Sequence, residues 1–246
     1  MLIQKAIILL ASLTITLSTM AETRPRPRPV NLVDPNQVKN GPRLHRTCVG
    51  CEDPLQGLSS GFFDDDADCT NFISREGTYG PWGRHIIEYL NALGDNSHMF
   101  KNNIPGMVAT KKGETAVCPK WNELSLTQRK HFWVWVFASL AWDESTCRAN
   151  ARNPNATNGV AVGLLQLEEA KSKRSWRGPN CRADSVADAR TNLRCGLDIM
   201  TELMKGKNGE YESNGKLYPT SSYWANFRSK KGGDAGALIR EFSACR

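Results

Sequence analysis

The chain has 246 residues, 40% of them hydrophobic, and its 32 Lys and Arg exceed its 25 Asp and Glu, which gives a net charge of +7. Past residues 1–21 no stretch is long and apolar enough to span a bilayer, which excludes a protein stably inserted in a membrane. The positive charge suits a polyanionic partner such as a bacterial cell wall. Nucleic acid is also polyanionic, but an exported protein seldom meets it, so no nucleic-acid partner is expected.

Residues 1–21 have the pattern of a secretory signal peptide. Lys5 supplies a positive start, residues 6–17 are apolar, and Thr19-Met20-Ala21 offers small residues where a signal peptidase cleaves. Because the apolar segment is short and is followed by polar sequence, we expect cleavage near Ala21 and a secreted protein, periplasmic or extracellular; the alternative is an uncleaved anchor. Loss of Lys5 would leave the mature chain with a net charge of about +6.

All eight cysteines follow the expected cleavage site. An even number of cysteines in an exported chain indicates up to four disulfides, whose pairing the sequence does not reveal. The alternative is a metal or redox site at Cys48-Val49-Gly50-Cys51, but zinc needs a second closely spaced Cys or His pair, which the sequence lacks. No metal and no cofactor are therefore expected. The cysteines are Cys48, Cys51, Cys69, Cys118, Cys147, Cys181, Cys195 and Cys245.

Two segments precede the main domain. Residues 22–47 begin with alternating Arg and Pro, which favours an extended tether that is either simply solvated or a basic strip near an anionic surface. Residues 48–120 are rich in cysteine, glycine and loops, and are expected to pack on the core as an extension. They contain one helix, over about residues 82–93, that Gly94 ends. The acidic run at 64–68 lacks the glycine and distant glutamate of a calcium loop and is interpreted as solvated or capping acids.

The rest of the chain, residues 121–246, carries strong helical signals. Ser125 is a good N-cap for a helix over residues 126–144, whose second half is apolar on every side, so this helix should be the buried centre of the domain. A second helix is expected from about residue 184 to Gly206, and a last one over residues 234–242. Strand-like alternation is scarce. The prediction is a mainly α, disulfide-bonded domain in which a small β element is allowed.

Glu144 ends the apolar central helix. A carboxyl group at the end of a buried helix is desolvated, which raises its pKa so that it holds a proton near neutral pH. A glycosidic bond needs such a proton, because the leaving alkoxide must be protonated as it departs. Asp143 lies about 100° away around the helix axis and should point elsewhere. The alternative is that Glu144 forms an ordinary ion pair with Arg148, four residues on.

Three short motifs follow one another in a recognisable order. Glu144-Ser145 is followed by Gly163-Leu164-Leu165-Gln166, and then by Asn192 and Gly196 one helical turn apart. Over residues 125–245 this order resembles the lytic transglycosylases and goose-type lysozymes of the lysozyme-like superfamily. The resemblance implies a lysozyme-like fold in which a Glu-Ser pair ends the central helix.

The resemblance also implies roles for individual residues. Glu144 would be the catalytic acid and base. The implied substrate-binding residues are Ser145, Gly163, Leu164, Gln166, Asn192 and Tyr223. Gly163 would let the backbone pass close to the sugar, Gln166 would lie in the cleft, and Asn192 with Gly196 would pack the following helix against the cleft. Tyr223, in Tyr223-Trp224-Ala225-Asn226, only loosely matches a fourth family motif, and an ordinary core aromatic is the alternative.

The mechanism implied by the resemblance uses a single glutamate. The sequence has no Asp or Glu between Glu144 and Gly163, so a second carboxylate would have to come from Glu168, Glu169 or the N-terminal half. With the N-acetyl group of the substrate attacking C1, Glu144 could then deprotonate water or the sugar's own hydroxyl. Hydrolysis and a 1,6-anhydro product therefore both stay open.

The expected function is cleavage of the β-1,4 bonds of peptidoglycan by a monomeric secreted enzyme. The Cys-rich extension is similar to the lysozymes of predatory bacteria that act on deacetylated peptidoglycan, which implies a preference for glucosamine-containing wall. Because a free amino sugar is cationic, this preference needs acidic or hydrogen-bond-accepting residues in the cleft. The alternative is a wall-binding or interaction module that keeps the fold without turnover.

Overall fold

We describe the fold from a computed structural model of the chain. The chain divides into two units, Met1–Thr47 and Cys48–Arg246, and every described residue lies in the second unit. The expected signal peptide, the tether, Cys48, Cys51 and the acidic run at 64–68 all lie outside the described residues. The described residues are 69–74, 78–109, 116–206, 216–218, 222–228 and 233–246.

The domain is built around one buried helix, as the sequence predicted. Helix α2 (Leu126–Ser145) begins with a capping box, in which the Ser125 side chain accepts from the main chain of Gln128 and the Gln128 side chain accepts in return. The whole stretch 131–141 of α2 is buried. A helix without a polar face can only be stable in the middle of a fold, so the other elements pack around α2.

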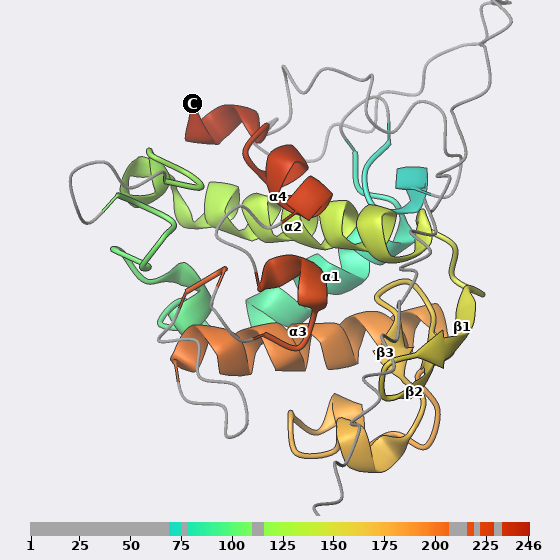
Figure 1. The fold of residues 1–246 in the computed structure, drawn as a ribbon. Helices are drawn as coiled ribbons and strands as arrows, with labels where there is room; N and C mark the ends of the chain where they lie inside the picture. The colour runs from blue at the N-terminus through green and yellow to red at the C-terminus, as the bar shows by residue number, and fades with distance from the viewer. Residues whose placement is uncertain (1–68, 75–77, 110–115, 207–215, 219–221, 229–232) are drawn as a thin grey trace, which may run out of the picture. The chain divides into compact units, whose positions relative to one another are not determined.

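Three further α-helices surround this centre (Figure 1). Helix α1 (Pro81–Ala92) contacts both α2 and α3 (Ala189–Lys205), and α4 (Gly233–Ile239) packs on α2. Their apolar residues join a single core that also takes in residues 69–73 and 99–108. The mainly α fold is confirmed, and α1 lies within one residue of its expected bounds at either end.

Helix α3 begins later than the sequence predicted, at Ala189 instead of near residue 184. The Asp184 carbonyl accepts from the guanidinium of Arg174, and the Val186 carbonyl accepts from the side-chain amide of Asn192. These carbonyl groups are therefore engaged by side chains before a helix can use them, and Asp188 caps the first turn instead. At the other end Gly206 closes α3 in the left-handed conformation, with φ +82°, as expected. The last helix is also shorter than predicted, ending at Ile239.

A small antiparallel sheet lies beside the C-terminal end of α2 (Figure 1). Its three strands follow chain order, β1 (Arg152–Ala156), β2 (Gly159–Val162) and β3 (Leu167–Glu168). The β1–β2 register shifts at a bulge, and residues 163–166 form the turn that joins β2 to β3. The sheet thus carries the predicted Gly-Leu-Leu-Gln motif to the end of the central helix.

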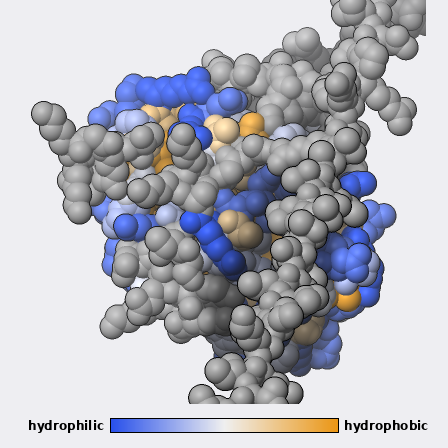
Figure 2. Space-filling view, viewed as in Figure 1, coloured by the Kyte–Doolittle hydropathy of each residue, from blue (hydrophilic) through white to orange (hydrophobic). Residues whose placement is uncertain are grey.

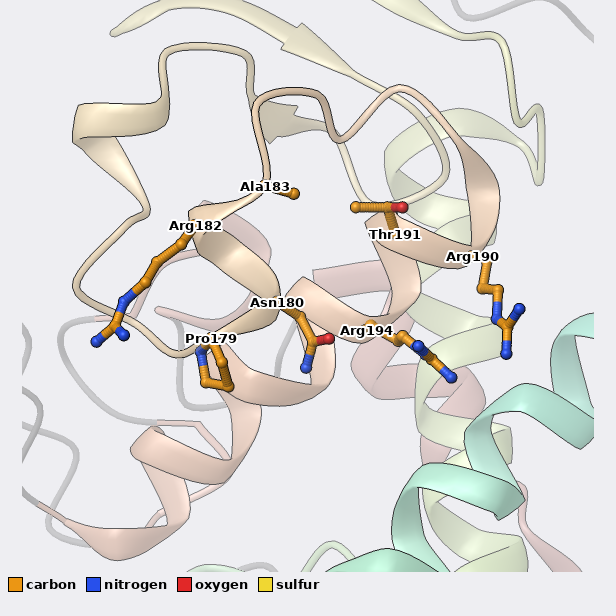
Figure 3. A pocket seen from close by; sticks show the side chains of 7 residues that line it. All are labelled: Pro179, Asn180, Arg182, Ala183, Arg190, Thr191 and Arg194. Carbon is orange, nitrogen blue, oxygen red and sulfur yellow. The ribbon is translucent and has the colours of Figure 1, made fainter.

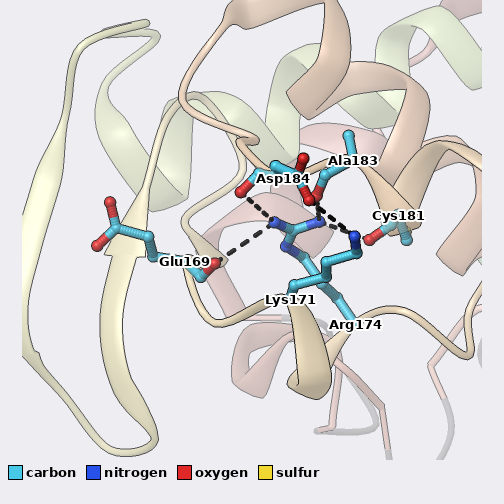
Figure 4. Close-up of polar contacts among 6 residues, drawn as sticks. All are labelled: Glu169, Lys171, Arg174, Cys181, Ala183 and Asp184. Atoms are coloured by element: carbon cyan, nitrogen blue, oxygen red, sulfur yellow. Dashed lines mark hydrogen bonds and ion pairs between the residues drawn. The ribbon is translucent and has the colours of Figure 1, made fainter.

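A buried arginine organises the loop between β3 and α3. Arg174 is fully buried, and its guanidinium donates only to main-chain carbonyl groups (Figure 4). Carbonyl oxygens can satisfy a buried cation without a second buried charge. The loop therefore wraps around this one side chain. The accepting carbonyls belong to Glu168, Glu169, Cys181, Ala183 and Asp184.

Three disulfides connect the described elements. Cys69–Cys147 ties the N-terminal segment to the end of α2, Cys118–Cys245 joins the segment before α2 to the C-terminus, and Cys181–Cys195 pins the loop to α3. The disulfide prediction is confirmed for these six cysteines. Of the surface visible in Figure 2, the described part is largely hydrophilic with small apolar patches. No helix among the described residues is long and apolar enough to cross a membrane.

Candidate active site

Three segments that are distant in the sequence meet around Glu144. They are the C-terminal end of α2, the turn at residues 163–166, and the segment at residues 222–228. The turn is held from both sides: Ser145 Oγ lies 2.8 Å from the Leu164 carbonyl oxygen, and Trp224 Nε1 donates to the Leu165 carbonyl at 2.9 Å. The main-chain atoms of the turn thus connect the other two segments.

The carboxyl group of Glu144 is half-buried and has one amide partner. Asn226 Nδ2 donates to Glu144 Oε1 at 3.1 Å. Burial first, and then the nearby Asp143 carboxylate, raise the pKa of Glu144, the Asn226 hydrogen bond lowers it, and together they bring it from 4.5 to about 7. Glu144 is therefore protonated in a large share of molecules near neutral pH, which a general acid requires.

The ion pair with Arg148, which was the alternative interpretation of Glu144, does not form among the described residues. Arg148 turns back and donates Nε to the Ser145 carbonyl at 3.1 Å, while Glu144 binds Asn226. Thr146 then breaks the helix in the left-handed conformation, with φ +54°, so the two side chains do not share a continuous helix face. Burial is therefore the main influence on the pKa of the Glu144 carboxyl group.

Ser145 lies behind the site instead of in an open cleft. Its side chain is 5% exposed, and Oγ is 2.9 Å from the Ala141 carbonyl and 2.8 Å from the Leu164 carbonyl. A hydroxyl group has one hydrogen, which these two carbonyls share. The predicted contact between Ser145 and substrate is replaced here by a bond that attaches the end of α2 to the turn.

Gly163 and Gln166 open and close the turn, and both adopt left-handed backbone angles, φ +76° and φ +45°. A Cβ atom on Gly163 would lie 2.4 Å from Asn192 Nδ2, so the glycine makes room for a buried amide. Gln166 is half-buried and donates Nε2 to the Gly163 carbonyl at 3.0 Å. The described structure thus explains Gly163 by packing inside the protein, whereas the sequence analysis expected a passing sugar.

Asn192 and Leu164 differ most from their expected roles in substrate binding, because both are fully buried. Asn192 Oδ1 accepts from the Leu165 N–H at 2.9 Å, and its Nδ2 donates to the carbonyls of Val162 and Val186. These three bonds use the whole amide group. Asn192 therefore shapes the turn from inside the fold.

Gly196, one helical turn after Asn192, also lies close to the 163–166 turn. A Cβ atom at this position would lie 2.2 Å from Leu165 Cδ1, so a larger residue would force the Leu165 side chain to move. The expectation that Asn192 and Gly196 pack this helix against the site agrees with their placement.

The segment at residues 222–228 supplies the contact that the sequence analysis missed. Tyr223 was the residue predicted to bind substrate, and its hydroxyl oxygen accepts from the Glu168 N–H at 2.8 Å. Asn226 is the residue that contacts Glu144. The motif Tyr223-Trp224-Ala225-Asn226 was the available signal. Its first aromatic residues fasten it to the turn and to β3, and its asparagine faces the acid.

The two acids considered as partners of Glu144 lie on the outer hairpin. Glu169 forms a bidentate ion pair with Arg152, whose Nη1 and Nη2 donate to Oε1 and Oε2 at 3.0 and 2.9 Å. Glu168 Oε1 accepts from Asn158 Nδ2 at 2.7 Å. Both carboxylates are thus occupied within the sheet. Among the described residues, no group of three His, Cys, Asp or Glu is arranged to hold a metal ion.

Comparison with known proteins finds one family model and three solved structures that are similar to this chain. Residues 123–225 match the family model named "Transglycosylase SLT domain", a span that covers α2, the sheet, α3 and part of the segment at 222–228. No curated protein matches the chain in sequence. Three solved structures of Bd0314 DslA, two of mutants and one of the wild type, are 21% identical and cover 68% of this chain and 91% of their own. Their TM-scores are 0.47, 0.45 and 0.44. Residues 123–225 of this chain are therefore similar to a transglycosylase SLT domain.

Proposed function

We propose that this chain is a secreted glycosidase that cleaves the β-1,4 bonds of peptidoglycan, with Glu144 as general acid and base. The proposal rests on the protonated state of Glu144. Its carboxyl group ends a buried helix, its pKa is raised to about 7, and a single amide from Asn226 holds it in place. The matched SLT domain supports peptidoglycan as the substrate.

The reaction begins with Glu144 already protonated, before the glycosidic bond breaks. Protonated Glu144 donates to the glycosidic oxygen as the bond lengthens, and its carboxylate is then stabilised by the amide of Asn226. The resulting carboxylate can take a proton from water or from the sugar's own hydroxyl group. Water yields hydrolysis, and the sugar hydroxyl yields a 1,6-anhydro product that is lighter by one water.

A single-carboxylate route is supported by the positions of the neighbouring acids. Glu168 and Glu169 are held by Asn158 and Arg152 on the hairpin. Both carboxylates already have partners there, so neither is a free base or nucleophile of the kind that two-carboxylate glycosidases use. Attack on C1 by the N-acetyl group of the muramic acid residue, which is retained when only the glucosamine is deacetylated, removes the need for one.

The finer proposal is that the site prefers wall in which glucosamine has lost its acetyl group. Such a sugar carries a cationic amine, which an acidic residue beside the cleft would attract. Asp143 is close enough to Glu144 to raise its pKa. Asp143 is thus the described acid best placed to recognise the amine. Asp143→Asn should reduce the preference for deacetylated wall more than it reduces activity on acetylated wall.

The test is fragment release from purified sacculi, native and enzymatically deacetylated, followed by mass spectrometry. The samples are the wild type, Glu144→Gln, and the control Glu123→Gln, which removes an exposed acid just before the other end of α2. We expect release by the wild type and by the control, and none by Glu144→Gln. Binding of the wild type to sacculi without release would instead support the non-catalytic wall-binding module. Equal activity on both walls would remove the deacetylation preference.

A further inference from the structure

An arginine-lined hollow lies on α3, on the side away from the 163–166 turn. Its volume is about 520 Å³. In Figure 3, Arg190 and Arg194 leave α3 on the same side, and Arg182 comes from the short helix Asn180–Arg182. The residues that line it are Pro179, Asn180, Arg182, Ala183, Arg190, Thr191 and Arg194.

The described part of the chain supplies no acid that balances the positive charge of this arginine hollow. None of its three arginines forms an ion pair with an acid in the part of the chain that the structure describes. The nearest acids in sequence are engaged elsewhere. Asp184 pairs with Lys171 at 2.7 Å, and Asp188 accepts from the Thr191 N–H at 3.0 Å to cap the helix.

Two of these arginines are also unfavourable for the helix that carries them. Arg190 and Arg194 are four residues apart, where like charges on a helix repel. Arg190 lies in the first turn of α3, where the helix dipole disfavours a cation. A cluster with these local costs and no acidic partner among the described residues is suited to an external anion. Guanidinium groups bind carboxylates in particular, since their paired N–H donors match the two carboxylate oxygens.

The position of the hollow indicates which anion could reach it. On α3, Asn192 and Gly196 face the 163–166 turn, while Arg190 and Arg194 belong to the outer side. The two sides of a helix are about 10 Å apart. An extended peptide of about four residues reaches about 13 Å. A short peptide attached to a glycan in the active site is therefore longer than α3 is wide, and could reach around the helix toward the hollow.

We propose that the arginine hollow binds the carboxylates of the peptide stems of peptidoglycan. The inference rests on the proposed substrate and adds a second point of recognition to it. The glycan would occupy the site at Glu144, and a stem of the same strand would reach across the end of α3. Uncrosslinked stems, which carry more free carboxylates, would bind better than crosslinked ones.

The test is a binding measurement that requires no turnover. In the full chain with Glu144→Gln, we would compare cosedimentation with sacculi and retention on beads that carry the same glycan strands after an amidase has removed their stems. The test variant adds Arg190→Gln and Arg194→Gln. The control adds Lys101→Gln and Lys120→Gln instead, which removes the same charge from exposed positions before the far end of α2.

We expect the arginine variant to bind stem-bearing wall about tenfold more weakly or worse, and to bind stripped glycan as well as its parent does. The lysine control should match its parent on both. Equal loss on both materials, or no loss on either, would overturn the proposal. Thermal unfolding checks the fold of the variants, and the arginine variant should be at least as stable as its parent because a repulsive pair is removed. Since the parent is inactive by design, failure of the stem proposal stays separate from failure of wild-type turnover.

Discussion

Asn226 Nδ2 lies 3.1 Å from Glu144 Oε1, although the two residues are 82 positions apart in the chain. The amide donates a hydrogen bond that favours the ionised carboxylate, whereas burial and the Asp143 charge favour the protonated acid. Burial is the largest of these influences, and the pKa of Glu144 rises to about 7. The contact thus limits how far the pKa rises and fixes where the proton is presented.

The first prediction concerns the pH dependence of the reaction. Glu144 must be protonated to act as an acid, and its pKa is raised to about 7, so kcat/KM should fall as pH increases through about 7. The measurement is the rate of fragment release from sacculi across this range. A rate that stays constant to about pH 9 would show that Glu144 does not donate the proton.

The second prediction is that two neighbouring substitutions move this alkaline limit in opposite directions. Asn226→Leu removes a donor that stabilises the carboxylate, so the pKa of Glu144 and the alkaline limit should rise. Asp143→Asn removes a like charge, so both should fall. The control is Asn122→Leu, which changes an exposed asparagine before the other end of α2 and should leave the profile unmoved. Shifts in the same direction for the two test variants would contradict this electrostatic account.

The third prediction concerns stability. Because the folded-state pKa of Glu144 is raised from 4.5 to about 7, its favourable contribution is complete below about pH 4.5 and is lost as pH rises through about 7. Glu144→Gln has a similar shape and does not ionise. The free energy of unfolding of this variant, relative to wild type, should therefore increase by about 3 kcal/mol between about pH 4 and pH 8. Urea unfolding at the two pH values measures this difference, and a constant difference would mean that Glu144 is not desolvated.

The fourth prediction separates backbone strain from close packing at Gly163. Gly163 and Gly94 have nearly the same φ, +76° and +74°, but only Gly163 has an atom near the place of a Cβ, Asn192 Nδ2 at 2.4 Å. Gly94→Ala should cost about 1 kcal/mol through strain alone. Gly163→Ala should cost about 3 kcal/mol or more, because it also displaces the buried amide of Asn192. It should lower activity too, since Asn192 holds the turn. Equal losses in urea unfolding would indicate that Asn192 can move aside freely.

The fifth prediction ranks two disulfides by the chain that they enclose. Cys118–Cys245 spans 127 positions and Cys181–Cys195 spans 14. Loop-closure entropy predicts that replacing the first pair by Ala costs about 5 kcal/mol and replacing the second about 3 kcal/mol. Urea unfolding of the two double variants checks the order. The reverse order would show that Cys181–Cys195 stabilises mainly through the loop around Arg174.

The parts of the site that depend on neighbouring residues could be predicted from the sequence. Glu144 follows an apolar stretch, and burial of that stretch alone is enough to raise its pKa. Ser125 with Gln128 likewise specified the start of α2 locally. By contrast, the bond from Asn226 depends on how the segment at residues 222–228 returns to the turn. No short sequence pattern predicts that this segment packs against the turn.

The motif spacing also could not say which way a side chain points. Asn192 was expected to bind substrate, yet its amide is fully buried and makes three bonds to the main chain around the turn. A polar residue in a motif suits either an exposed contact or a buried support. Similarly, the late start of α3 depends on Arg174, a residue outside the helix whose guanidinium occupies the Asp184 carbonyl. Long-range hydrogen bonds decide both cases.

The Cys118–Cys245 disulfide has a further consequence for a protein exposed to proteases. It joins the segment just before α2 to the next-to-last residue, and so encloses the central helix, the sheet, α3 and the segment that supplies Asn226. A single cut anywhere between these two cysteines would leave both fragments covalently joined. The nicked protein could keep Glu144 and Asn226 together, so that one proteolytic event would not separate the acid from its partner.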